Sequence, residues 1–333
     1  MDMRFSGSAA ATSLSRATYD PKKLAAIHTG AALALSLVLT VLNFVINRGI
    51  DSTGGLANFG NRAVLSTLQS VLSLAGNLAL PFWEVGFLYA ALGWAQGREV
   101  TPADLWEGFR RMGIVARLYL LLAGIFMLVI FASLEIASIL FSFTPFFEST
   151  LTNMQAVIDQ ATAAGQTTID AAMLEQLLPS MVPIYILFFI VLIVIMIPLT
   201  YRLRMAMFAA MDDAPGARKA IGASVRMTRR NCFDLFRVDL RFWWFYLGQL
   251  LIAGVAYLDA LLPALGMQLP IHGDILFFVC YGLYLALQLV FAWHFQAKVQ
   301  TTYAHCYLAL KAAAAPPPTP QMPQYPNWQG PKP

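Results

Sequence analysis

The chain has 333 residues, of which 58% are hydrophobic and only 12% are charged, and its formal net charge at pH 7 is +4. Soluble domains contain roughly half apolar and about one quarter charged residues, so this composition excludes an ordinary soluble globular protein. It is typical of a chain that folds inside a membrane. The small net charge gives no indication of a nucleic-acid partner.

Six apolar runs are long enough to cross a membrane as helices, which takes about 20 residues for a hydrocarbon core of about 30 Å. They cover residues 24–46, 64–96, 116–143, 182–203, 235–258 and 275–297. The second run is too long for one straight crossing, and Pro81 removes a backbone donor within it, so we expect a kink or a tilt there. The sequence therefore predicts an all-α polytopic transmembrane bundle of six spans over residues 24–311, preceded by a leader over residues 1–23.

Two segments outside the spans have the pattern of amphipathic helices. In 101–112, Thr101 is a candidate N-cap before Pro102, and Leu105, Trp106, Phe109 and Met112 share one helical face. In 216–230, after the candidate N-cap Asp213, basic side chains cover one side and apolar ones the other. We expect the second helix to lie at the membrane interface, with its apolar side among acyl chains or packed on the bundle.

The basic residues of this region continue into the start of the fifth span. The candidate headgroup-binding residues are Arg218, Lys219, Arg226, Arg229, Arg230, Arg237 and Arg241. Asp234 has the helical spacing to bridge Arg230 and Arg237. These cations have two interpretations that the sequence does not distinguish. They either recognise anionic lipids or are simply the basic residues common in cytoplasmic loops.

The distribution of Lys and Arg predicts the orientation, because cytoplasmic loops retain basic residues. Of the 22 basic residues, only Arg48 and Arg62 fall in the alternate set of loops, and residues 144–180 contain none. Both termini are therefore predicted to be cytoplasmic, including a disordered Pro-rich tail over 312–333. The outer segment 144–180 is predicted to form two short helices, 149–163 and 168–178, as a packing hairpin, a cap on the bundle or a lid over a substrate cavity.

Two segments of the chain resemble those of a known family. Ser224 and Met227, followed by LFRVDLRF at 235–242 with Asp239, and TTYAHCY at 301–307 are similar to the hallmark segments of a bacterial six-span integral membrane family known as domain of unknown function 975. Arg241, Ala297, Lys298 and Cys306 depart from that pattern. The resemblance implies a six-span protein of the cell membrane, and it brings neither an activity nor a catalytic residue.

Ionisable residues at membrane depth are costly, so each is a functional candidate. Those in or beside the predicted spans are Glu84, Glu135 and Asp239. Opposite helix directions place Glu84 and Glu135 at different depths, so we expect no carboxylate pair. Glu84 is expected to pair with Arg117 or with the charges around Asp239, or to be protonated. Asp239 is expected to face the bundle in a packing ion pair.

The sequence contains no metal-binding or nucleotide-binding motif, and Cys232, Cys280 and Cys306 are expected to remain thiols. We therefore expect no cofactor, no metal and no enzyme activity. The favoured function is engagement of membrane lipids, or of partner membrane proteins, through the basic helices. The alternative is a small-molecule or lipid transporter with its polar centre at Glu84.

Overall fold

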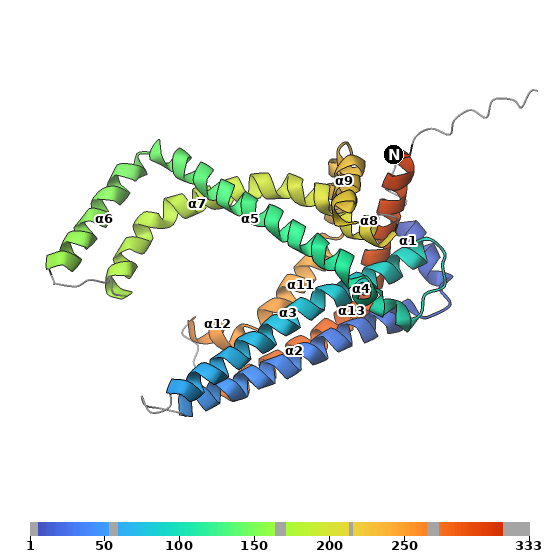
Figure 1. The fold of residues 1–333 in the computed structure, drawn as a ribbon, viewed down its shortest axis with the longest axis horizontal. Helices are drawn as coiled ribbons and strands as arrows, with labels where there is room; N and C mark the ends of the chain where they lie inside the picture. Colours follow the sequence, from blue (N-terminus) through green and yellow to red (C-terminus); the bar gives the residue numbers. More distant parts are fainter. Residues whose placement is uncertain (1–5, 53–58, 164–170, 213–215, 265–272, 316–333) are drawn as a thin grey trace, which may run out of the picture.

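The computed structural model describes residues 6–52, 59–163, 171–212, 216–264 and 273–315. Every regular element in these ranges is a helix (Figure 1). The elements are α1 (Ser6–Ser15), α2 (Pro21–Ser52), α3 (Phe59–Ala95), η3 (Pro102–Trp106), α4 (Glu107–Arg110), α5 (Met112–Ser142), α6 (Phe146–Ala163), α7 (Ala171–Leu203), α8 (Ala206–Asp212), α9 (Ala217–Thr228), α10 (Cys232–Arg241), α11 (Trp243–Val255), α12 (Leu258–Ala264) and α13 (Gly273–Ala314).

Five of these helices, α2, α3, α5, α7 and α13, have the length and apolar composition needed to cross a membrane. They correspond to the first, second, third, fourth and sixth predicted spans. The expected all-helical architecture is thus confirmed, and the five long apolar helices are compatible with the expected multi-pass membrane protein. Residues 6–15 of the leader form α1. The last helix, α13, differs from expectation because it runs 42 residues, well past the predicted end of the sixth span at 297. The tail beyond residue 315 lies outside the described residues.

The fifth predicted span, 235–258, is wrong as one continuous helix. The chain forms α10 and α11 with a break at Phe242, whose φ of −103° and ψ of 16° are not helical. Arg237 and Arg241 are exposed on α10, whereas α11 is strongly apolar. A change of direction at Phe242 lets the charged helix and the apolar helix take different environments. The 13 residues of α11 rise only about 20 Å, too little to cross a membrane alone.

The outer segment also differs from expectation. The predicted second short helix is the first part of α7, which continues through Pro179, Pro183 and Pro198 to Leu203. The apolar run persists on both sides of these prolines, and membrane helices tolerate them. Helix α6 packs along α7, with the Thr150 hydroxyl donating to the Ser180 carbonyl at 3.0 Å, and Figure 1 places it away from α2, α3 and α13. It forms a packing hairpin with α7 and does not cap those helices; residues 164–170 lie outside the described ranges.

The long helices form two arms. Helices α2, α3 and α13 pack on one another, α5 packs along α7, and the two groups diverge from a common end near α8 and α9 (Figure 1). We call this common end the junction. The largest fully buried side chains concentrate there; they include Phe87, Leu92, Leu105, Leu118, Met205, Met211, Leu235 and Leu310. The arms themselves expose apolar side chains, as expected for helices surrounded by lipid.

The ends of α13 show how the chain runs between α9 and α13. The Asp274 carboxylate pairs with Arg48 near the end of α2, far from the junction. At its other end, the Lys311 ammonium lies 2.7 Å from the Asp212 carboxylate of α8. The chain therefore passes from the junction to the opposite end of the bundle through α10, α11 and α12. The pairing also gives Arg48, one of the two topological exceptions, a partner.

Candidate lipid interface

Helix α9 is amphipathic, and its two sides face different surroundings. Ala217, Ala220, Ser224, Met227 and Thr228 are buried. The Ser224 hydroxyl donates to the Arg202 carbonyl at 2.6 Å, which fixes α9 on the end of α7. The apolar side therefore packs on the protein rather than among acyl chains. The candidate N-cap Asp213 lies outside the described residues, and Gly216 occupies the N-cap position in the structure.

Exposed cations extend over the outer side of α9 and onto α10. They are the predicted Arg218, Lys219, Arg226, Arg229, Arg230, Arg237 and Arg241, and we call this set the basic face. Among the described residues, Asp234 pairs with Arg237, at 3.5 Å, but not with Arg230. The Arg241 guanidinium lies close to Gly7 of α1. The remaining five members, Arg218, Lys219, Arg226, Arg229 and Arg230, are exposed.

Large apolar side chains are exposed next to these cations. Phe233, Leu240 and Trp243 are 62%, 53% and 61% exposed, and the Arg237 guanidinium carbon lies 4.6 Å from the centre of the Phe233 ring. Such aromatic rings beside Arg are characteristic of the headgroup region, where one part of a side chain is apolar and the other is wet. Helix α10 thus has the surface of a helix that lies at a membrane interface.

Asp239 lies on the opposite side of α10 and faces the bundle. Its carboxylate forms an ion pair with Arg204, which connects α7 and α8. It also accepts hydrogen bonds from the Tyr201 hydroxyl of α7, at 2.7 Å, and from the Tyr303 hydroxyl of α13. The Arg204 guanidinium in turn donates to the Tyr246 hydroxyl of α11 at 2.8 Å. This Asp239 cluster joins α7, α10, α11 and α13 at the junction.

A second carboxylate at the junction is Asp212, at the end of α8. Besides Lys311, it accepts hydrogen bonds from the Tyr307 hydroxyl at 3.0 Å and from the Gln96 amide at 3.1 Å. Nearby, the Arg111 guanidinium donates to the Met211 carbonyl at 2.8 Å. Arg111 and Arg204 thus bind acceptors of the protein itself, whereas most of the basic face is exposed and makes no ion pair among the described residues.

The segment 101–112 is not the single amphipathic helix that its sequence predicts. It forms the 3₁₀ helix η3 and the short α4, although Thr101 does take the N-cap position, with its N–H donating to the Asp104 carboxylate at 2.7 Å. Leu105 is buried, whereas Trp106 and Met112 are exposed. The tighter 3₁₀ winding changes which side chains share a face, which explains the difference.

Glu84 has neither of its predicted charged partners. Its carboxylate lies 3.9 Å from Nε2 of His28, a buried side chain on α2. The His28 ring stacks on Phe87, with centroids 4.7 Å apart, and the Trp83 indole donates to the His28 carbonyl at 2.8 Å. His28 is absent from the ionisable candidates chosen by sequence, although its position inside the first predicted span was a usable signal. Glu135 is exposed on α5 and is not brought to Glu84.

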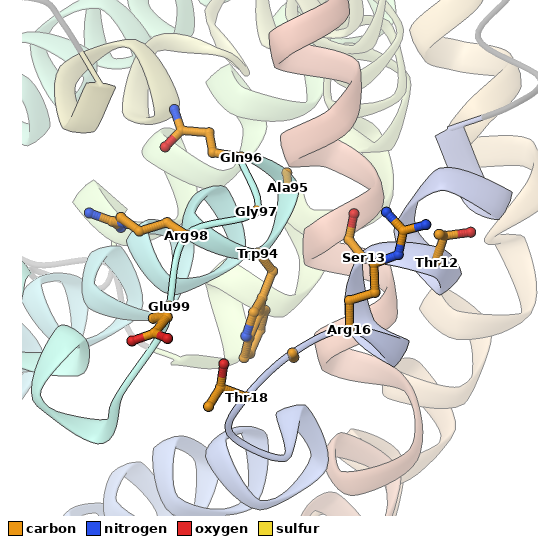
Figure 2. A pocket seen from close by; sticks show the side chains of 11 residues that line it. Thr12, Ser13, Arg16, Thr18, Trp94, Ala95, Gln96, Gly97, Arg98 and Glu99 are labelled. Atoms are coloured by element: carbon orange, nitrogen blue, oxygen red, sulfur yellow. The ribbon is translucent and has the colours of Figure 1, made fainter.

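A cavity of about 420 Å³ lies between the α1–α2 connection and the end of α3. Figure 2 shows the side chains that line it. Thr18, Trp94 and Glu99 line it, and the Trp94 indole N–H is buried without an acceptor among the described residues. Glu84 does not line this cavity, nor does it line the 520 Å³ cavity described below. The expectation that a transporter would hold Glu84 in a central cavity therefore gains no support from these cavities.

The described residues hold no group of three His, Cys, Asp or Glu side chains with metal-binding geometry. Cys232, Cys280 and Cys306 form no disulfide bond. Comparisons with protein families, with curated proteins and with solved structures gave no match to this chain.

Proposed function

We propose that the chain crosses the cell membrane six times, with α10, α11 and α12 together making the fifth crossing and both termini on the cytoplasmic side. The path of the chain between α9 and α13 supports this count, because it connects opposite ends of the bundle. The concentration of basic residues at the junction supports the orientation. We also propose that the chain belongs to the domain of unknown function 975 family, which it resembles and whose members have six spans.

The proposed function is non-enzymatic binding of anionic lipid headgroups by the basic face. The observation that carries it is the exposure of cations on α9 and α10 beside exposed Phe233, Leu240 and Trp243. Each Arg or Lys near an anionic membrane surface contributes about 1 kcal/mol of attraction. Packing of α9 on α7 fixes the backbone of α9, so the side of this helix that carries the cations is set before lipid arrives.

Replacement of Arg226, Arg229 and Arg230 by Gln tests this function. Native mass spectrometry of protein extracted with its lipids should show at least about a tenfold loss of loosely bound phosphatidylglycerol, because three attractive charges are removed. The matched control replaces Arg16, Lys22 and Lys23, which change the net charge equally but lie outside the basic face. Equal lipid loss in the two variants, or full retention in the first, would refute the proposal; retention of a copurifying protein instead would point to a protein partner.

The Glu84→Gln variant distinguishes lipid binding from the alternative function, transport that depends on Glu84. Lipid binding by the basic face predicts that this variant retains phosphatidylglycerol at the wild-type level, because Glu84 contacts His28 and not the basic face. A carboxyl-dependent transporter would instead lose the pH dependence of its solute uptake in the same variant.

A further inference from the structure

A cavity of 520 Å³ lies where the beginning of α5 meets the beginning of α9. Its polar lining consists of Arg117 from α5 and Arg218 and Lys219 from α9. All three side chains are exposed, and none of them pairs with an acidic side chain among the described residues. The cavity thus concentrates three positive charges that the described protein leaves uncompensated.

The backbone adds to the attraction for an anion. Gly216, which also lines the cavity, is the N-cap of α9 and provides no side chain to bind the first N–H groups of the helix. The positive end of the helix dipole favours a negative group at this position. The two independent sources of attraction, the three side chains and the helix terminus, meet in one cavity.

The rest of the wall is apolar and continues into the membrane-facing surface. Leu120 and Leu121 line the cavity, and Leu120 is 73% exposed. Further along α5, Met127, Leu128 and Phe131 are also exposed. A Cβ at Gly124 would meet no other atom, so the surface between Leu120 and Leu128 is open. An apolar track therefore leads from the cationic cavity along α5 and away from the junction.

We propose that this cavity binds one anionic glycerophospholipid, with its phosphate among Arg117, Arg218 and Lys219 and an acyl chain along Leu120 and the exposed side of α5. The anionic headgroup of such a lipid matches the cationic side chains of the cavity, and its acyl chain matches the apolar surface of α5. A volume of 520 Å³ lies within the usual range for small-molecule sites, roughly 300–1,000 Å³. The inference rests on the proposed lipid function. It adds a single site that binds one lipid molecule, and it includes Arg117, which does not belong to the basic face.

The test compares two triple variants of the full chain with equal charge loss. The cavity variant carries Arg117→Gln, Arg218→Gln and Lys219→Gln, and the surface variant carries Arg226→Gln, Arg229→Gln and Arg230→Gln. Native mass spectrometry with dioleoyl phosphatidylglycerol should show one tightly held lipid on the wild type and on the surface variant. The cavity variant should bind that lipid at least about tenfold more weakly. Dioleoyl phosphatidylcholine should not occupy the site.

The possible outcomes separate this inference from the proposed function. Loss of loosely bound lipid in the surface variant, with the tight lipid kept in the cavity variant, would overturn the discrete site and leave the proposed function standing. Unchanged binding in both variants would overturn both. Displacement of the tight lipid by millimolar inorganic phosphate would identify a site for free phosphate and would overturn the lipid assignment.

A crosslinking measurement on the unmodified protein guards against a variant that fails to fold. Phosphatidylglycerol with a photoactivatable diazirine on one acyl chain should crosslink to α5 between Leu120 and Phe131 in the wild type. Crosslinks confined to α2, α3 or α13 would contradict the proposed position of the acyl chain. Arg117→Lys, which preserves the charge, should retain the tight lipid.

Discussion

At the scale of single residues, Asp239 is the most highly connected carboxylate of the junction. Only 17% of its side chain is exposed, and its ion-pair partner Arg204 is 23% exposed. Charges removed from water to this extent depend on their partners, because a lone charge in such a place keeps the cost of dehydration without the compensating attraction. The tyrosine hydroxyls of Tyr201 and Tyr303 complete the hydrogen bonding of the carboxylate.

Asp239→Asn should therefore destabilise the protein substantially. The neutral amide leaves Arg204 without its counter-charge, and we expect a loss of roughly 3 kcal/mol in the free energy of unfolding. Reversible unfolding in mixed detergent micelles, followed by tryptophan fluorescence, measures this quantity.

The matched control is Asp234→Asn on the same helix. Asp234 also pairs with an Arg, but the Arg237 side chain is 61% exposed, so the pair should contribute less than about 1 kcal/mol. Similar losses in the two variants would show that the Asp239 cluster has no special role in holding the junction.

Helical periodicity in the sequence correctly predicts that Asp239 faces the bundle. Its partners were beyond prediction because they come from other helices, with Tyr303 64 residues further along the chain. Periodicity determines which side of a helix faces inward, but it does not determine which helix lies there. The same limit explains why periodicity does not identify His28 as the neighbour of Glu84.

At the scale of secondary-structure elements, two glycines allow η3 and α4 to pack against α3. A Cβ at Gly86 of α3 would overlap the Leu105 carbonyl, and a Cβ at Gly108 of α4 would overlap the Phe82 carbonyl. The obstructing atoms belong to the backbone, which has no alternative rotamer. The close approach of these segments therefore requires glycine at both positions.

Gly86→Ala and Gly108→Ala should each destabilise the protein by about 1–3 kcal/mol, because the added methyl group forces the backbones apart. The control is Gly124→Ala on α5, where a Cβ meets no other atom. That change should be neutral or slightly stabilising, since alanine favours the helix. The same detergent unfolding measurement applies, and a neutral Gly86→Ala would contradict the packing described for η3.

Five of the six predicted spans correspond to long helices because apolar runs of membrane length are a strong local signal. The fifth failed because a charged amphipathic stretch, around Arg237 and Arg241, runs directly into an apolar one. Hydropathy averages across that boundary and does not detect the break at Phe242. The basic face was predictable from the sequence, but Arg117 belongs to the lipid cavity only through the packing of α5 on α9.

At the scale of the whole molecule, two arms of apolar helices extend from one densely packed junction (Figure 1). The junction contains the Asp239 and Asp212 clusters, the basic face and the cationic cavity. If it lies on the cytoplasmic side, the cations are presented to the membrane leaflet whose anionic lipids attract them. The proposed function therefore depends on which side of the membrane the junction occupies.

Single-cysteine labelling tests that orientation most directly. In a background with Cys232, Cys280 and Cys306 replaced, Gly222→Cys reports on α9 and Thr152→Cys reports on α6; both positions are exposed. A membrane-impermeant maleimide added to intact cells should label Thr152→Cys at once, and Gly222→Cys only after the cells are permeabilised. Labelling of Gly222→Cys in intact cells, with protection of Thr152→Cys, would place the junction on the outer side and contradict the proposed orientation.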